Sequence, residues 1–246
     1  MKRPSTALPA DGASTPPPLM EVYRRLHRRF GPQHWWPAET RFEVIIGAIL
    51  TQSAAWTNVE KAIANLKGVG VLWPAALRDI PLSHLAQLVY PSGYFNAKAK
   101  KIRAFVEYLG EHYADDLDAL FSQETTALRR ELLSIHGIGE ETADSIILYA
   151  AHRPAFVIDA YTRRIMNRLG LPLEEDTYGA YQRLFTRALP QDLKLYNEYH
   201  ALLVALGKEV CRKEPLCRRC CLRPLCAYAR RSGGQEETGA PMEEAS

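Results

Sequence analysis

One carboxylate is set apart from the other charged residues in the middle of the chain. Asp159 follows the apolar run 156–158 and is followed by Arg163 and Arg164. A carboxylate in such surroundings can stabilise positive charge that develops in a reaction, and it can activate a water molecule. Asp159 is also a normal helix N-cap, because its side chain can accept a hydrogen bond from the first helical turn. The two roles are compatible, and we take Asp159 as the candidate catalytic residue.

All five cysteines lie in the last 36 residues of the 246-residue chain. Secreted disulfide scaffolds spread their cysteines along the sequence, so this clustering indicates a metal or cluster site instead. Four thiolates in one short loop can surround an iron–sulfur cluster or a tetrahedral zinc ion. Cys221 lies beside Cys220 and is an alternative ligand to it. The candidate ligands follow the spacing C-x5-C-x2-C-x5-C and are Cys211, Cys217, Cys220 and Cys226.

Two glycines, Gly137 and Gly139, interrupt an apolar pattern that resumes at helical spacing from Ala143. Glycines one residue apart allow a tight turn where a Cβ atom would clash. The turn leads into a helix N-terminus, whose free backbone N–H groups can bind a phosphate without reading a base. A corner between two helices, in which the glycines serve packing alone, is the other interpretation.

Apolar residues recur at helical spacing along most of the remaining chain, and no long segment alternates as a strand does. We therefore predict an all-α protein. Residues 1–18, rich in Pro, Ser, Thr and Ala, and residues 229–246 are predicted to be disordered tails. The predicted helices are 19–30, 42–50, a segment ending at 66, 73–78, 82–88, 96–113, 125–135, the second hairpin helix, a helix from Asp159 to 169, 178–188 and 195–210.

Composition bounds the class of protein. At 47% hydrophobic residues the chain can bury a core, but it contains no run of eighteen apolar residues and no signal-peptide pattern. We therefore expect an intracellular, cytoplasmic and nucleoid-associated protein that does not enter a membrane. The net charge is +3 although residues 233–246 hold four glutamates and no basic residue, so the remainder is more basic than the total. A basic body suits a polyanionic partner, and it also suits an ordinary soluble protein.

The order of these features resembles the helix-hairpin-helix DNA glycosylases of the endonuclease III superfamily. A glycine pair followed twenty residues later by an aspartate carries the resemblance, which extends over about residues 20–226. The resemblance implies that Asp159 does the chemistry and that the turn around Gly137 and Gly139 holds the DNA backbone. It also implies two helical domains that flank a DNA-binding cleft. These would be a helical barrel at 40–152, which contains the hairpin, and a second domain made of 19–39 and 153–228, which contains the cysteine loop 211–226.

In this superfamily the cysteine loop holds a 4Fe–4S cluster, with six, two and five residues between the ligands. The first gap is one residue shorter in this chain. The resemblance favours a 4Fe–4S cluster, and zinc is the alternative. We expect the cluster to be structural, because cleavage of an N-glycosidic bond needs no redox step.

The position two residues after the second glycine separates two kinds of superfamily members. Bifunctional members carry a lysine there, and its amine forms a Schiff base with the sugar and nicks the strand. In this chain the position is Glu141, and a carboxylate cannot form an imine. The resemblance therefore implies a monofunctional glycosylase that leaves an abasic site.

Several stretches are similar to the 3-methyladenine DNA glycosylase III branch. That branch holds an alkylated purine between aromatic rings, where a methylated, positively charged base gains cation–π attraction. Trp35, Trp36 and Trp56 are the base-pocket candidates that follow, and core packing is the alternative for each. Some members of the branch lack the cysteine loop that this chain has. The similar stretches are Trp35-Trp36-Pro37, 50–61, Pro91-Ser92-Gly93 with 96–100, and Asp159-Ala160-Tyr161.

Other positions follow from the same resemblance. Gln52 matches the residue that the superfamily inserts into the emptied base stack, and a buried structural amide is the alternative. Adenine-mismatch relatives have a glutamate five residues before it, where this chain has Gly47, which argues against that specificity. Lys98 and Lys100 either approach DNA phosphates or cap a turn of the fold. His200 lies on an apolar helix, and we interpret it as a core histidine.

Three functions remain open on the sequence. The first is a base-excision-repair glycosylase that removes alkylated purines such as 3-methyladenine. The second is an endonuclease III-like glycosylase for oxidised or mismatched pyrimidines, with weak or no AP lyase activity. The third is a non-catalytic protein that binds damaged or abasic DNA. Each implies double-stranded DNA with damaged bases as the partner, and we expect a monomer.

Overall fold

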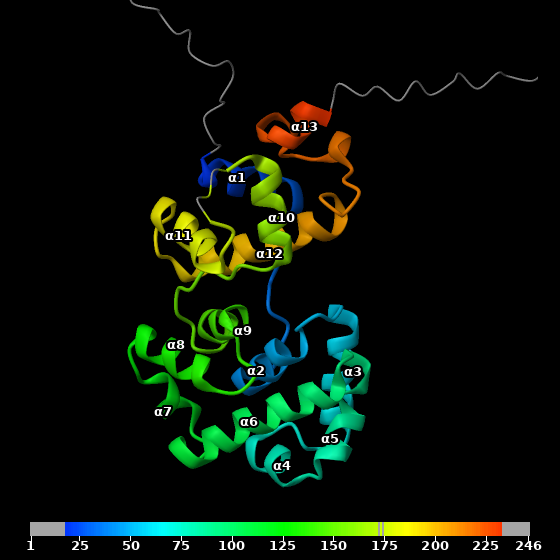
Figure 1. Cartoon of the computed structure of the whole chain (residues 1–246), viewed down its shortest axis with the longest axis vertical. Helices are drawn as coiled ribbons and strands as arrows, with labels where there is room; N and C mark the ends of the chain where they lie inside the picture. The colour runs from blue at the N-terminus through cyan, green and yellow to red at the C-terminus, as the bar shows by residue number, and fades with distance from the viewer. Residues whose placement is uncertain (1–17, 172, 174, 233–246) are drawn as a thin grey trace, which may run out of the picture.

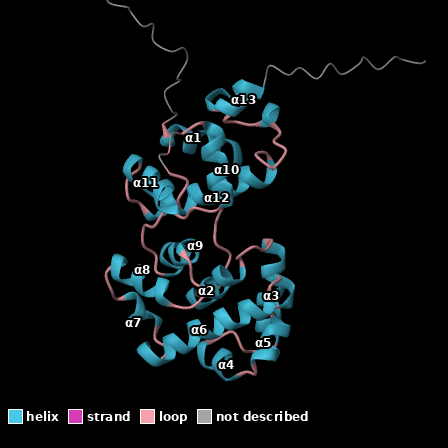
Figure 2. Cartoon of the chain, in the orientation of Figure 1, coloured by secondary structure: helices cyan, strands magenta, loops and turns pink. Residues whose placement is uncertain are grey.

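The computed structural model describes residues 18–171, 173 and 175–232 of the chain. Within these ranges the chain forms helices, turns and loops and contains no strand (Figure 2), so the all-α prediction is confirmed there. None of the described helices is long and apolar enough to cross a membrane.

The helices gather in two groups, one above the other in Figure 1. The first group comprises α2 (Arg41–Leu50), α3 (Trp56–Gly68), α4 (Pro74–Asp79), α5 (Leu82–Leu88), α6 (Phe95–Tyr113), α7 (Leu117–Phe121), α8 (Thr125–Ser134) and α9 (Glu140–Ser145). The second group comprises α1 (Leu19–Phe30), α10 (Ala160–Leu169), α11 (Tyr178–Ala188), α12 (Leu193–Glu209) and α13 (Ala227–Ser232). The chain passes between the groups twice, through residues 31–40 and 151–159 (Figure 1).

Short helical turns complete the set. A π-helical turn, η2 (Ile146–Ala150), continues α9 directly. Three turns of 3₁₀ helix are η1 (Tyr90–Ser92), η3 (Cys217–Arg219) and η4 (Arg223–Leu225). The last two lie in the cysteine loop.

Helix α2 is the centre of the first group. Thr40 caps its N-terminus by accepting a hydrogen bond from the Glu43 backbone N–H at 3.1 Å. All residues from Phe42 to Leu50 are buried, which explains why this segment is apolar on every side and not amphipathic. The neighbours that cover α2 include α3, α6, α9 and η2.

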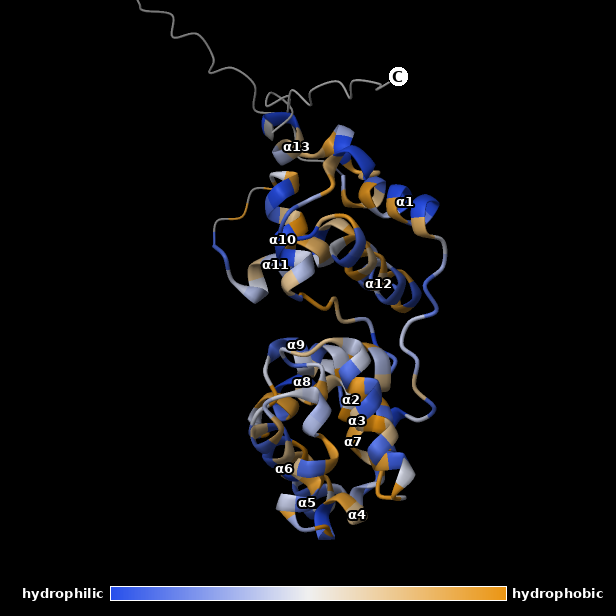
Figure 3. Cartoon of the chain, turned by 90° about the vertical axis from the view of Figure 1, so that its right-hand side faces the viewer, coloured by the Kyte–Doolittle hydropathy of each residue, from blue (hydrophilic) through white to orange (hydrophobic). Residues whose placement is uncertain are grey.

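Helix α1 belongs with the C-terminal helices although it begins the described chain. It buries Leu19, Val22 and Leu26 at helical spacing, and it packs on α12. The Tyr199 hydroxyl of α12 donates a hydrogen bond to the Leu19 carbonyl at 2.8 Å. The first helix of the chain therefore completes the group that also carries the cysteine loop. Figure 3 shows hydrophobic and hydrophilic residues alternating around these helices, as expected for amphipathic elements.

Most predicted helices are confirmed, with boundaries that differ by at most two residues. Two short helices were not predicted. Helix α7 has five residues, and its one local signal is the N-cap Asp116, which accepts a hydrogen bond from the Asp118 backbone N–H at 2.8 Å. Helix α13 includes residues 229–232, so the prediction that the C-terminal tail begins at 229 is wrong there. The remaining tail residues, 1–17 and 233–246, lie outside the described part of the chain.

Candidate active site

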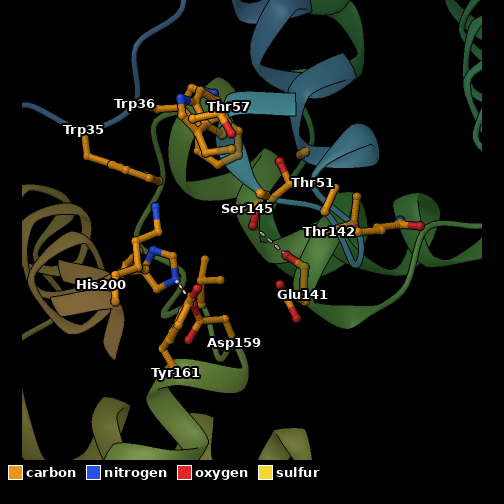
Figure 4. A pocket seen from close by; sticks show the side chains of 18 residues that line it. Trp35, Trp36, Thr51, Thr57, Glu141, Thr142, Ser145, Asp159, Tyr161 and His200 are labelled. Carbon is orange, nitrogen blue, oxygen red and sulfur yellow. Dashed lines mark hydrogen bonds and ion pairs between the residues drawn. The ribbon is translucent and has the colours of Figure 1, made fainter. Parts of the chain in front are cut away.

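A cavity of about 410 Å³ opens between the two groups of helices (Figure 4). Each group contributes to its walls: the linker 31–40, the segment after α2, the start of α3 and α9 come from one side, and α10 and α12 from the other. The residues that line it include Trp35, Trp36, Gln52, Trp56, Glu141, Asp159, Tyr161, His200 and Lys208. Asp159, all three predicted pocket tryptophans and Gln52 therefore share one cavity.

Asp159 lies at the start of α10, where the chain has just crossed between the groups. Its Oδ1 accepts a hydrogen bond from the Thr162 backbone N–H at 2.7 Å, so it is the N-cap of this helix. Its other oxygen, Oδ2, lies 3.6 Å from His200 Nε2. The side chain is 13% exposed, and that exposure is toward the cavity (Figure 4).

The pKa of Asp159 is lower than its ordinary value. Burial raises it, because water no longer solvates the charge, but the nearby His200 ring and the cap bond from Thr162 lower it by more. The carboxylate is therefore ionised at neutral pH in spite of its surroundings. An ionised carboxylate in a partly dehydrated cavity can stabilise positive charge more strongly than it could in water.

The interpretation of His200 as a core histidine is confirmed by its burial. Its ring also lines the cavity and reaches Asp159 from α12 (Figure 4), which the sequence analysis did not predict. Val204 and Lys208 line the same cavity, so one face of α12, at positions four residues apart, forms a wall. That spacing of a histidine, a valine and a lysine was the signal available in the sequence. It was missed because a histidine on an apolar helix is more often core.

The three tryptophans form one aromatic cluster. The Trp36 ring meets the Trp56 ring edge to face, with centroids 5.1 Å apart, and the Trp35 ring lies 5.8 Å from Trp56. Trp36 also packs over Gly47, where a Cβ atom would approach its ring to 3.3 Å. The small residue at 47 therefore leaves room for an indole ring beside the cavity.

Positive charge also reaches this aromatic wall. Lys208 Nζ lies 5.7 Å from the centroid of the Trp35 ring, within the range of a cation–π interaction. The Lys208 ammonium group therefore lies beside one of the three tryptophan rings predicted to contact a base. This lysine was not among the predicted site residues.

Glu141, in the first turn of α9, faces Asp159 across the cavity (Figure 4). Its side chain is accessible from the cleft, yet the surrounding protein removes enough water to raise the pKa of Glu141, and the Asp159 charge raises it further. Charge from His200 and Arg163 acts in the opposite direction. The two carboxyl groups of the cavity thus differ in proton affinity, with Asp159 the stronger acid.

The glycine turn joins α8 to α9, and the two glycines differ in what they require. Gly137 has a φ of +85°, and a Cβ atom there would overlap the Lys101 side chain. Gly139 has an ordinary φ of −93° and open space around it. A second, shallower hollow lies over this turn, and Lys101 and Arg163 are the basic residues that line it.

Gln52 ties the turn to the first group of helices. Its Nε2 donates hydrogen bonds to the Gly137 carbonyl and to Thr142 Oγ1, each at 3.0 Å, and its Oε1 accepts one from Lys101 Nζ. The Gln52 amide therefore stabilises the hairpin through hydrogen bonds and also lines the cavity. Its insertion into a base stack stays a prediction.

The two lysines predicted to contact DNA differ in position. Lys98 is buried, and its Nζ donates hydrogen bonds to the Leu50 carbonyl at 2.8 Å and the Ser92 carbonyl at 2.6 Å. A buried ammonium group that is bonded to two carbonyls cannot reach a phosphate, so the DNA contact predicted for Lys98 is wrong and the turn-capping alternative holds. Lys100 is exposed, and its contact with DNA stays a prediction.

The turn that Lys98 fastens presents an aromatic side chain that the sequence analysis did not single out. Tyr94 is 75% exposed and adopts a left-handed backbone conformation, with φ of +45°. Because Lys98 bonds to both Leu50 and Ser92, this turn is held beside the segment that carries Gln52.

The cysteine loop closes against the far end of α10. The four predicted ligands, Cys211, Cys217, Cys220 and Cys226, line one small apolar cavity together, whereas Cys221 is not among its lining residues. Arg168 Nη1 donates a hydrogen bond to Cys211 Sγ at 3.3 Å, and Cys226 Sγ donates one to the Arg168 carbonyl at 3.2 Å. No group of three or more His, Cys, Asp or Glu side chains within the described ranges is arranged to hold a metal ion.

Comparisons with known proteins agree with this geometry. Residues 46–191 match the family described as HhH-GPD superfamily base excision DNA repair protein. A protein of Methanocaldococcus jannaschii, provisionally named a DNA repair glycosylase, is 44% identical over 85% of this chain and 95% of its own length. Endonuclease III of Thermotoga maritima is 31% identical over 89% of this chain and 96% of its own length.

Two solved structures show the same fold. The 3-methyladenine DNA glycosylase of H. pylori, bound to 1,N6-ethenoadenine, superposes with a TM-score of 0.66 at 27% identity, over 77% of this chain and 96% of that one. A non-covalent endonuclease III–DNA complex superposes with a TM-score of 0.77 at 21% identity, over 88% of this chain and 97% of that one. The chain therefore belongs to the HhH-GPD superfamily of base excision DNA repair proteins and is a DNA glycosylase with the all-helical fold of endonuclease III.

Proposed function

We propose that this protein is a monofunctional DNA glycosylase that removes alkylated purines from double-stranded DNA by hydrolysing the N-glycosidic bond. One observation carries the proposal: an ionised carboxylate, Asp159, and three tryptophans line a single cavity beside the glycine turn. The tryptophans would bind the base, the carboxylate would face the sugar, and backbone N–H groups of the glycine turn would bind a phosphate.

The chemistry requires the base to leave the stack before it can be cut. An extruded base stacks on aromatic side chains, and the Trp35, Trp36 and Trp56 cluster supplies them. Loss of the base leaves positive charge on the deoxyribose, which the Asp159 carboxylate stabilises while it orients or deprotonates a water molecule. The low pKa of Asp159 keeps it in the charged form that this role needs.

Glu141 accounts for the absence of strand cleavage in this proposal. A carboxylate cannot form the imine through which a lysine at this position nicks the strand. The raised pKa of Glu141 keeps a proton on it to higher pH than on Asp159.

The turn around Gly137 and Gly139 would hold the DNA backbone. The first N–H groups of α9 have no partner within the helix, and Lys101 and Arg163 add positive charge to the hollow above them. Tyr94, exposed beside the Gln52 segment, adds an aromatic ring that can stack on DNA bases.

For the cysteine loop we propose a 4Fe–4S cluster held by Cys211, Cys217, Cys220 and Cys226. The donor set fits, because these four thiols line one apolar cavity and Cys221 does not. The cluster would join Cys211, just after α12, to Cys226, just before α13, which packs on α10. Zinc in the same loop is the alternative.

Two observations bear on the lesion. The H. pylori relative, whose structure contains 1,N6-ethenoadenine, favours an alkylated purine. Lys208 beside Trp35 places a positive charge where a cationic base would stack, which favours a neutral adduct within that class. The second candidate is a pyrimidine lesion, favoured by the identity to endonuclease III of Thermotoga maritima.

A panel of lesion duplexes tests the proposal. We expect release of free 3-methyladenine from alkylated DNA, or of 1,N6-ethenoadenine from a defined duplex, with an abasic site and no strand break as products. Processing of thymine glycol or of mismatched thymine or uracil instead would support the second candidate. Tight binding to an abasic-site analogue without turnover of any lesion would show a non-catalytic binding protein and overturn the proposal.

A further inference from the structure

A histidine and a tyrosine stand behind Asp159, and the reaction proposed above uses neither of them. The Tyr149 hydroxyl lies 2.6 Å from His200 Nδ1, and His200 Nε2 lies 3.6 Å from Asp159 Oδ2. Tyr149 belongs to η2, His200 to α12 and Asp159 to the start of α10. Three separate elements thus bring these side chains together, and Figure 4 shows the two that line the cavity, His200 and Asp159.

The hydrogen bond from Tyr149 determines which ring nitrogen of His200 carries the proton. Burial and the charges of Asp159 and Glu198 raise the pKa of Tyr149, so the phenol keeps its proton. Within the described residues the only hydrogen-bond partner of that hydroxyl is His200 Nδ1. An imidazole that accepts the phenol's hydrogen bond at Nδ1 carries its hydrogen on Nε2, which faces Asp159.

The two oxygens of Asp159 therefore face different groups. Oδ1 accepts the cap bond from the Thr162 N–H at 2.7 Å, and Oδ2 faces the His200 N–H. Nε2 is buried and forms no hydrogen bond within the described part of the chain, because 3.6 Å is too long for one. A buried N–H that faces a carboxylate at this distance is poised to form a short bond, and such catalytic contacts often tighten when substrate binds.

We propose that His200, itself held by Tyr149, is a positioning residue that fixes the free oxygen of Asp159 for the sugar of an extruded nucleotide. Without the histidine the carboxylate keeps its cap bond alone and can rotate about it. The inference rests on the proposed role of Asp159, and it adds the two side chains that orient it.

Four other charged residues lie near Tyr149, His200 and Asp159 or act on them. Glu141 on α9 faces Asp159 from across the cavity, and Arg163 on α10 acts on Glu141. On α12 itself, Glu198 acts on Tyr149, and Lys208 stands against Trp35. Among the described residues, His200 is the ion-pair partner that lies within 4 Å of an Asp159 oxygen.

Three variants of the full chain test the proposal. His200→Leu removes the N–H and keeps an apolar side chain, His200→Gln keeps an N–H donor without a ring, and Tyr149→Phe removes the hydroxyl that fixes the tautomer. We expect His200→Leu to lower the single-turnover excision rate by about tenfold to a hundredfold, the effect of losing one hydrogen bond to a charged group. His200→Gln should recover most of that loss, and Tyr149→Phe should fall between them.

Two further measurements separate positioning from general support of the fold. Affinity for a duplex with an abasic-site analogue should change by less than about twofold in all three variants, because none of them contacts the DNA backbone hollow. A carbon-13 NMR titration should show a higher pKa for Asp159 in His200→Leu than in the parent, because the histidine no longer opposes the effect of burial. In His200→Gln the rise should be smaller.

Unchanged excision and an unchanged Asp159 titration in His200→Leu would overturn the inference. So would parallel losses of rate, DNA affinity and melting temperature that glutamine does not rescue, because these indicate a structural role. If the parent releases no lesion, the proposed function fails first. The NMR titration then still decides whether His200 holds Asp159.

Discussion

At the scale of single residues, the cavity is defined by the charges that face it. Asp159 is ionised and lies 3.6 Å from His200, the pKa of Glu141 is raised, and Lys208 places a cation 5.7 Å from the centroid of the Trp35 ring. Each of these groups comes from a different element, so their separate substitution leaves the other walls in place.

Glu141→Lys should give the protein a strand-nicking activity that the proposed monofunctional parent lacks. The position lines the cavity opposite Asp159, so an amine there can reach the sugar of the extruded nucleotide and form a Schiff base. Borohydride should trap a covalent enzyme–DNA complex with this variant and none with the parent. Trapping by the parent at the same level would show that another lysine already serves as the nucleophile.

Lys208→Met should shift preference toward cationic bases. Methionine keeps the contact with Trp35 but removes the positive charge that repels a methylated, charged purine. The ratio of excision rates for 3-methyladenine over neutral 1,N6-ethenoadenine should rise about twofold to fivefold, as expected for a partly exposed charge. A ratio equal to the parent's would show that Lys208 does not sense the charge of the base.

At the scale of elements, the hairpin between α8 and α9 depends on one glycine more than on the other. Gly137→Ala places a Cβ atom both in a left-handed conformation and against Lys101, and Lys101 also bonds Gln52. The free energy of unfolding should fall by about 1–3 kcal/mol, and DNA affinity should fall with it. Chemical denaturation and a DNA-binding titration measure the two effects.

Gly139→Ala is the matched control. Its φ of −93° suits any residue and its surroundings are open, so stability should stay within about 0.5 kcal/mol of the parent. Equal destabilisation by the two alanines would mean that the turn does not have the geometry described.

Elements were more predictable from the sequence than the contacts between them. The helices 19–30, 82–88 and 178–188 have the predicted boundaries because apolar periodicity and local capping act within a few residues. Helix α7 was missed because five residues are too few to show a period. The contacts of Lys98 with Leu50 and of His200 with Asp159 were not predicted, because these partners are 48 and 41 residues away in sequence and periodicity cannot bring them together.

At the scale of the whole molecule, the active cavity and the cysteine loop lie at opposite ends of α10. Asp159 caps its first turn, and Arg168 in its last turn bonds Cys211 and the loop backbone. Helix α12 packs along α10. It carries His200 near its middle, and Cys211 follows its C-terminal end. The cysteine loop therefore packs against the end of α10 that lies away from Asp159.

Cys217→Ala should therefore act through the fold. We expect loss of iron, a melting temperature lower by several degrees, and an excision rate that falls in proportion to the folded fraction. Cys221→Ala is the matched control, because Cys221 does not line the shared cavity, and it should keep both iron and melting temperature. Loss of iron in Cys221→Ala would mean that Cys221 is a ligand.

The most direct measurement is the single-turnover excision rate of Asp159→Asn on the lesion that the parent removes fastest. Asparagine can still cap α10 through its carbonyl oxygen, so the fold and DNA affinity should be kept while the negative charge is lost. We predict a fall in rate of at least about a thousandfold, with affinity for an abasic-site analogue within about threefold of the parent. An asparagine variant that excises the lesion at the parent's rate would contradict the assignment of Asp159 as the catalytic carboxylate.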